Sequence, residues 1–180
     1  MNERSDSELV QGAADGNKHA YGLLYDRYAP LVRAVCYDQT GHLADAQDLA
    51  QDVFVRAYQR LGALRKPDRF GQWLVGIARL RCREWQRQKR REQSKRQAEV
   101  RTASAGPDHK NNGSLERLRH CVTQLPRKER LALHAFYLLD QSAEDARRTV
   151  GLSRSGFYRV LERGRKRLER LMAREREDIR

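Results

Sequence analysis

Two sets of ionisable side chains recur at helical spacing in the first half of the chain. Asp45, Asp48 and Asp52 are separated by three and four residues, so they would share one face of a helix. Further along, arginine recurs at every fourth position from Arg79 to Arg91. A carboxylate face suits a basic protein partner, whereas a row of guanidinium groups suits a polyanion such as nucleic acid.

Each charged set lies beside an apolar stripe that would bury the helix carrying it. Leu49, Val53 and Ala57 recur every fourth residue along the acidic helix, and Phe70, Trp73, Leu74 and Ile77 precede the basic stripe. Trp85 lies within the basic stripe, where its ring either stacks on an unpaired base or packs against a neighbouring helix. The basic candidates for nucleic-acid contact are Arg79, Arg83, Arg87, Arg90 and Arg91, with Trp85 as the candidate stacking residue.

A third candidate surface lies near the C-terminus. Ser142 begins a capping-box pattern, Gly151-Leu152-Ser153 forms a tight turn, and a long basic helix follows. A short helix, a glycine-containing turn and a long basic helix are typical of a helix-turn-helix. Side chains near the start of such a recognition helix reach base edges in the major groove, and other basic side chains meet phosphates. The base-reading candidates are Ser155, Tyr158, Arg159 and Arg163, and the phosphate-binding candidates include Arg154, Arg165 and Lys166.

These surfaces require an all-α fold of two small helical domains. Four helices are expected in the first domain, at about residues 5–14, 18–37, 43–61 and 69–91, with Pro30 bending or dividing the second. Residues 92–113 contain few large apolar side chains, which predicts a flexible linker, or one that begins as a helical extension of the basic helix. The expected domains are residues 1–91, a four-helix bundle, and residues 114–180, the helix-turn-helix domain, in which Ser114 is the expected cap of the first helix.

The composition narrows the class of partner. The formal net charge of the 180-residue chain is +13, which favours a polyanion. No apolar run approaches the roughly 20 residues that cross a bilayer, and the N-terminus lacks a secretion segment, so a cytoplasmic protein is expected. The three cysteines lie far apart and are expected to be reduced, with no metal or cofactor. No nucleotide-binding, zinc-protease or other catalytic motif is present, so an enzyme is not expected.

The ordered motifs resemble those of the extracytoplasmic-function (ECF) sigma factors of bacterial RNA polymerase. The first match runs through Asp45-Ala46-Gln47-Asp48-Leu49, then Gln51-Asp52-Val53-Phe54, and continues at Phe70, Trp73-Leu74 and Ile77-Ala78-Arg79. The second comprises Leu125-Pro126, Arg130, Gly151-Leu152-Ser153, Ser155-Gly156-Phe157-Tyr158-Arg159 and Arg163-Gly164-Arg165. Two motifs in the right order are far more specific than either one alone.

The resemblance implies a role for each surface. Asp45, Asp48 and Asp52 would dock on core RNA polymerase. Arg79 to Arg91 and Trp85 would contact the downstream (−10) promoter element, and the last helix would read the upstream (−35) element. Family members are often held by an anti-sigma factor, so such a protein is a further candidate partner, although no residue identifies one.

Three positions depart from the family pattern. Leu80 replaces a usual asparagine and Gln47 a usual glutamate, while Arg147 stands where a small residue usually lets two helices approach. A helix-turn-helix regulator that never engages polymerase is the main alternative function, followed by an anti-sigma or adaptor protein. The regulator would need neither the acidic face nor the helix from Phe70 to Arg91, and the anti-sigma or adaptor protein would not support promoter-directed initiation.

Overall fold

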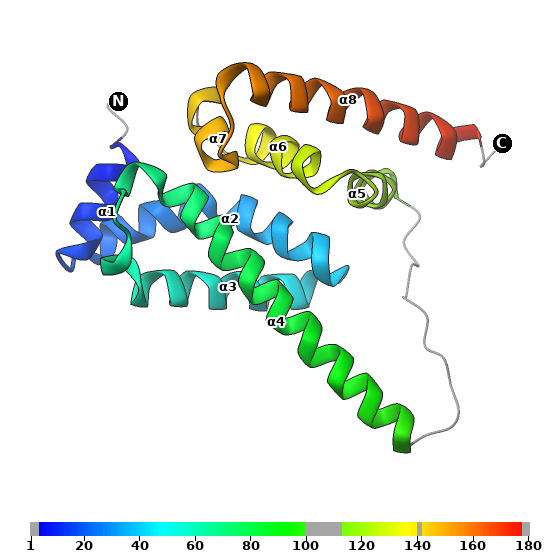
Figure 1. Cartoon of the computed structure of the whole chain (residues 1–180), viewed down its shortest axis with the longest axis horizontal. Helices are drawn as coiled ribbons and strands as arrows, with labels where there is room; N and C mark the ends of the chain where they lie inside the picture. Colours follow the sequence, from blue (N-terminus) through cyan, green and yellow to red (C-terminus); the bar gives the residue numbers. More distant parts are fainter. Residues whose placement is uncertain (1–3, 100–112, 140–141, 178–180) are drawn as a thin grey trace.

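The computed structural model describes residues 4–99, 113–139 and 142–177, and all the regular secondary structure in these ranges is helical, as predicted (Figure 1). The helices form two groups. The first comprises α1 (Asp6–Ala14), α2 (Lys18–Thr40), α3 (Leu43–Gln59) and α4 (Phe70–Glu99). The second comprises α5 (Ser114–Thr123), α6 (Arg127–Leu138), α7 (Ala143–Val150) and α8 (Arg154–Glu177). Short 3₁₀ helices at Leu61–Ala63 and Pro67–Arg69 lie between α3 and α4.

Local capping fixes where the first helices begin and end. The Ser5 hydroxyl accepts a hydrogen bond from the Glu8 backbone N–H at 3.3 Å, and the Glu8 carboxylate accepts one from the Ser5 N–H at 2.7 Å. The backbone bond is the main reason that the pKa of Glu8 lies below its usual value. Asn17 caps α2, which ends at Gly41, whose φ of 69° is left-handed and suits glycine.

Pro30 does not divide α2, contrary to one of the two expected outcomes. Leu31 and Val32, which follow it, are fully buried, and α2 continues to Thr40. Burial of these side chains against the bundle outweighs the loss of one backbone hydrogen bond.

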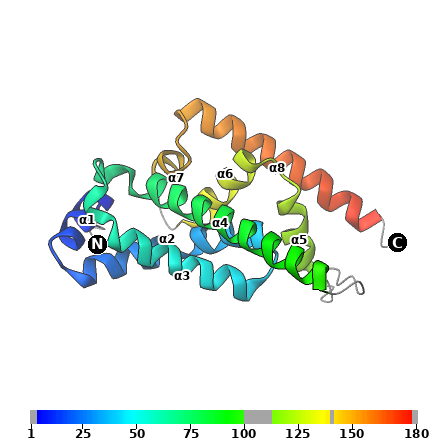
Figure 2. The same cartoon turned by 60° about the horizontal axis from the view of Figure 1, so that its bottom comes forward.

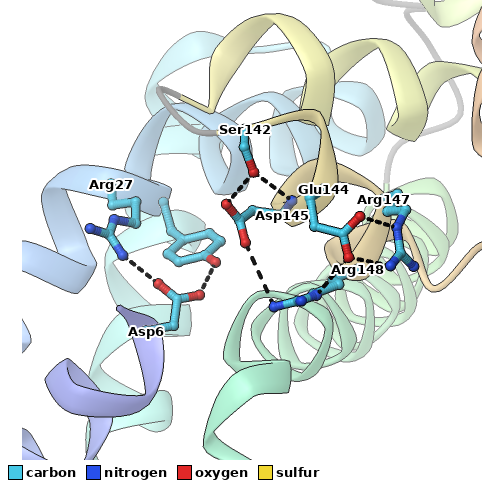
Figure 3. A network of polar contacts seen from close by, with 8 residues as sticks. Asp6, Arg27, Ser142, Glu144, Asp145, Arg147 and Arg148 are labelled. Atoms are coloured by element: carbon cyan, nitrogen blue, oxygen red, sulfur yellow. Dashed lines mark hydrogen bonds and ion pairs between the residues drawn. The ribbon is translucent and has the colours of Figure 1, made fainter. Parts of the chain in front are cut away.

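The core of the first group lies between α2, α3 and α4. Tyr28, Val53, Phe70 and Leu74 have no more than 1% of their surface exposed. The Tyr28 hydroxyl donates a hydrogen bond to Asp6 of α1, which also pairs with Arg27 at 2.6 Å (Figure 3). This buried polar contact fixes α1 on the side of the bundle.

The second group is built around α6. Phe157 and Leu161 of α8 are buried, and a Cβ added at Gly164 would lie 3.3 Å from Leu133 Cδ1, so α6 and α8 approach closely there. The cap of α5 is Gly113, one residue before the expected Ser114. At the other end of the group, Ser142 caps α7 as predicted (Figure 3).

The two groups pack against each other and share a continuous apolar core, a contact that the sequence did not predict. Figures 1 and 2 show α6 and α7 lying along α2 and α4. Asp38 of α2 is central to this contact, because Arg130 Nε of α6 lies 2.5 Å from one of its oxygens and His134 Nε2 lies 3.2 Å from both. The side chains of Asp38 and Arg130 are each only 9% exposed.

The segment predicted as a linker begins within a helix. Residues 92–99 continue α4 beyond Arg91, and residues 100–112 lie outside the described part of the chain.

Candidate protein- and nucleic-acid-binding surfaces

The three predicted docking carboxylates lie along α3, but their surroundings differ. Asp52 accepts a hydrogen bond from Arg81 Nε of α4 at 2.6 Å and lies 3.7 Å from Arg56. Asp45 lies 3.6 Å from Lys89 Nζ. Asp48 is exposed and has no ion-pair partner among the residues that the structure describes. Asp48 is therefore the carboxylate available to a partner, while Asp52 holds α3 to α4.

An apolar groove continues from Asp48 along the same side of α3. Gln51, Val55 and Tyr58 follow at helical spacing, and Val55 and Tyr58 are 54% and 41% exposed. Across from them lies Tyr25 of α2, which packs on the ring of Phe54 at 4.6 Å. The groove encloses about 510 Å³.

Sequence reasoning missed this groove. The side chains of Gln51, Val55 and Tyr58 form a second stripe beside the buried stripe of Val53 and Ala57. An exposed valine and tyrosine on a helix that already has a buried apolar stripe indicate a second contact surface beside the core. The sequence pattern could therefore have indicated the groove.

The basic stripe on α4 does not present one uniform face. Arg79 is half-buried where α4 meets α6, and burial and the nearby Arg127 guanidinium lower its pKa. Arg83 borders the same contact but is exposed, as are the remaining predicted arginines, Arg87, Arg90 and Arg91. The packing of the second helical group against the first therefore partly covers Arg79, the first arginine of the stripe.

Trp85 is half-buried and packs against the core, which bears out the packing interpretation for part of its ring. Lys89 Nζ lies 5.1 Å from the ring centroid, within cation–π range. A base that stacks on Trp85 would therefore have to displace Lys89 or use another part of the ring.

The first turns of α8, the predicted recognition helix, are exposed. The Ser153 hydroxyl accepts a hydrogen bond from the Gly156 N–H at 3.2 Å and caps the first turn of α8. Phe157 anchors this turn in the core. The side chains predicted to contact bases or phosphates in the first two turns are all exposed: Arg154, Ser155, Tyr158 and Arg159.

The later basic residues of α8 have partners within the protein. Arg163 Nε lies 4.0 Å from Glu129, and Lys166 Nζ lies 2.8 Å from Glu162. The Arg165 guanidinium stacks 5.1 Å from the Phe136 ring. Arg165 and Lys166, the predicted phosphate contacts, lie farther along the helix, where phosphate contact requires less exact placement than base readout. Arg163, a predicted base contact, has a side chain that is 63% exposed beside Glu129.

Arg147 does not separate the two helices of the helix-turn-helix. It pairs with Glu144 at 2.6 Å and donates to the Leu152 carbonyl at 3.4 Å, so its side chain follows the turn (Figure 3). Its neighbour Ala146 is the buried residue, with 2% of its surface exposed. The departure from the family pattern is therefore accommodated without loss of close packing.

Within the described ranges, no helix is long and apolar enough to cross a membrane. No group of three or more histidine, cysteine or acidic side chains in these ranges is arranged to hold a metal ion.

Residues 24–92 match the Sigma-70 region 2 family. The chain is 44% identical over 73 residues to the ECF RNA polymerase sigma factor BldN of Streptomyces coelicolor, a match that covers 40% of this chain but only 28% of BldN. It is 28% identical to the RNA polymerase sigma factor YlaC of Bacillus subtilis over 87% of this chain and 94% of YlaC. The chain thus spans well under half of BldN but nearly all of YlaC.

The fold is similar to that of CnrH, solved in complex with the cytosolic domain of CnrY. The TM-score is 0.63, with 24% sequence identity, and the match covers 94% of this chain and 98% of CnrH. Both helical groups therefore have counterparts in one solved protein.

Proposed function

The chain belongs to the ECF family of RNA polymerase sigma factors, and we propose that it binds core RNA polymerase and directs initiation at specific promoters. The chemistry of RNA synthesis belongs to the polymerase, so this chain selects the start site and is not itself an enzyme. We place this activity in the cytoplasm, where polymerase and chromosome meet.

The observation that carries the proposal is the open surface on α3. Asp48 and the groove beside it remain exposed although the two helical groups are packed together. An exposed carboxylate next to exposed aromatic side chains combines a charge that orients a basic partner with apolar area that holds it. Of the three carboxylates predicted to bind polymerase, we assign the direct contact to Asp48. Asp45 and Asp52 support it by pairing with Lys89 and Arg81, which hold α3 against α4.

Promoter reading is assigned to the two basic helices. The first two turns of α8 present Arg154, Ser155, Tyr158 and Arg159 for the upstream element. Arg79, Arg83, Trp85, Arg87, Arg90 and Arg91 of α4 are assigned to the downstream element. Because Arg79 is half-buried against the second group, the full stripe requires that the groups separate.

An inhibitory protein is proposed as a second class of partner. CnrH was solved with the cytosolic domain of CnrY, and the groove on α3 offers this chain an apolar surface for a protein of that kind. Such a protein would compete with polymerase if it covered Asp48.

The test is binding of the purified full chain to bacterial core RNA polymerase by co-elution at moderate salt. Asp48→Lys reverses one exposed charge and breaks no ion pair among the described residues, so we expect a folded chain with at least about tenfold weaker binding, consistent with the loss of a rim charge and its orienting effect.

Asp15→Lys is the matched control. It makes the same change of charge at an exposed position at the end of α1, whereas the groove is lined by side chains of α2 and α3, and it should bind like the unaltered chain. If the unaltered, folded chain does not bind polymerase, the sigma assignment fails and α8 would serve a stand-alone DNA-binding regulator. If Asp48→Lys binds normally, polymerase docks elsewhere.

A further inference from the structure

Two of the three cysteines are neighbours in the fold. Cys36 of α2 and Cys82 of α4 are separated by 46 positions in sequence, yet their sulfur atoms lie 3.9 Å apart. Cys36 is fully buried and Cys82 is 2% exposed. The third, Cys121, is also buried but belongs to α5, in the other helical group.

Cys82 borders a small polar cavity where the two groups meet. The cavity encloses about 30 Å³, more than the roughly 10–15 Å³ that one water molecule requires. A molecule with one or two oxygen atoms therefore fits beside the Cys82 thiol. The charged side chains that line the cavity are Asp38, Arg79, Arg83, Arg127 and Arg130.

The surroundings distinguish the two thiols. The hydrogen bond with Cys36 and the charges of Arg127 and Arg81 lower the pKa of Cys82, although burial and Asp38 oppose them. The same hydrogen bond, together with burial, raises the pKa of Cys36. Cys82 lines the cavity, so we assign it as the thiol that peroxide reaches and that reacts as the thiolate, with Cys36 as the second thiol beside it.

The helices already approach closely at this point. Gln86 Nε2 of α4 donates a hydrogen bond to Gln39 Oε1 of α2 at 3.1 Å, one turn beyond the thiol pair. A disulfide requires the sulfurs to approach from 3.9 Å to about 2.05 Å, a change of less than 2 Å.

We propose that Cys36 and Cys82 form a peroxide-oxidisable dithiol that closes to an intramolecular disulfide between α2 and α4. The Cys82 thiolate attacks one oxygen of hydrogen peroxide, the O–O bond breaks, and the departing hydroxide takes up a proton to leave as water, which leaves Cys82 as a sulfenic acid. The Cys36 sulfur then attacks the Cys82 sulfur, the S–O bond breaks and the second oxygen leaves as water. In total, two thiols and one peroxide give one disulfide and two waters, with the thiols oxidised and the peroxide reduced.

The position of the pair gives the reaction a structural consequence. Cys36 precedes Asp38, which holds Arg130 and His134 of the second group, and Cys82 lies between Arg79 and Arg83. The disulfide would therefore fix α2 to α4 where the first group meets the second and where the predicted DNA-binding stripe begins.

The test uses the reduced full chain, treated with hydrogen peroxide and analysed by peptide mass spectrometry. We expect a loss of two of the three thiols and a linked peptide pair that contains Cys36 and Cys82. Cys121→Ser is the matched control and should give the same linked pair. Linkage through Cys121, predominant dimers, or thiols that stay reduced in the folded chain would overturn the proposal.

Two variants separate the steps. Cys36→Ser should stop at a Cys82 sulfenic acid that dimedone captures, whereas Cys82→Ser should give neither a disulfide nor a dimedone adduct at Cys36. The unaltered chain unfolded in guanidinium should lose the preference for the Cys36–Cys82 pair, and an unchanged preference would show that the fold does not direct the reaction. These measurements read thiol chemistry alone, so they are independent of polymerase binding.

Discussion

Arg159 is exposed on the second turn of α8, next to Tyr158, which is 45% exposed. The first turn is fixed by the Ser153 cap and by Phe157 in the core, so the position of the Arg159 backbone is well determined. We predict that Arg159→Ala lowers the base specificity at one or two positions of the upstream promoter element. The variant should lose about 1–3 kcal/mol of binding free energy on the preferred promoter sequence. Initiation by the reconstituted holoenzyme on promoters substituted at single positions would measure this.

Lys166→Ala is the comparison for Arg159→Ala. Lys166 pairs with Glu162 and lies farther along α8, so its loss should weaken binding evenly across promoters and lower the salt dependence. An even loss for Arg159→Ala would instead make Arg159 a phosphate contact.

The sequence located individual side chains where a single local turn determines them. Ser155, Tyr158 and Arg159 depend on the cap and on the spacing from Gly151, which are visible in the sequence. It did not distinguish Asp48 from Asp45 and Asp52, because that difference arises from Lys89 and Arg81 on another helix. Ion pairs between helices follow from packing, which periodicity does not specify.

Gly71, in the first turn of α4, lies where three helices meet. A Cβ at this position would lie 2.5 Å from Thr149 Oγ1 of α7 and 2.6 Å from the Tyr28 ring of α2. We predict that Gly71→Ala lowers the free energy of unfolding by about 1–3 kcal/mol, the usual cost of overpacking. Urea denaturation of the full chain measures the change.

Gly76→Ala is the control on the same helix. Apart from its chain neighbours and the backbone of its own helix, no atom of the described residues lies within 4 Å of a Cβ added at Gly76, so the variant should gain up to about 1 kcal/mol from helix propensity. Equal stability of the two variants would mean that neither Thr149 of α7 nor the Tyr28 ring packs this closely on Gly71 in solution.

Helix boundaries were predictable where the chain contains a cap. Asn17, Ser142 and Gly151 begin or end their helices close to the expected positions. The end of α4 was left open, at Arg91 or beyond it, because no proline or glycine follows Arg91 to stop the helix, and the structure continues α4 to Glu99. The 3₁₀ helices between α3 and α4 were also missed, since three residues are too few for a periodic pattern.

At the scale of the whole molecule, the contact between the two groups depends on Asp38. Asp38→Asn would leave Arg130 and His134 facing a neutral amide, and a buried cation that loses its counter-charge is strongly unfavourable. We predict that the groups separate, because separation lets water reach both side chains, and that the radius of gyration measured by small-angle X-ray scattering increases. Asp26→Asn removes an exposed charge from the same helix and should leave the radius unchanged. If the radius of Asp38→Asn is also unchanged, Asp38 does not hold the groups together.

The two helical groups were predictable, but their contact was not. The change in composition after Arg91 marks the separation between them, whereas Asp38 and Arg130 read in sequence as ordinary surface charges. The shapes of both helical groups together decide which polar faces meet. The spacing of residues along one helix does not specify that contact.

The partial burial of Arg79 also affects how the chain distributes itself in a cell. A chain with net charge +13 is attracted to DNA of any sequence, and each guanidinium group withheld from phosphate reduces both that attraction and its dependence on salt. Packing of the two helical groups half-buries the Arg79 guanidinium, whereas Asp48 and the groove beside it stay exposed. Under the proposed function, a chain whose two helical groups are packed together would therefore be retained for less time on unrelated DNA, and its search for polymerase would be shorter.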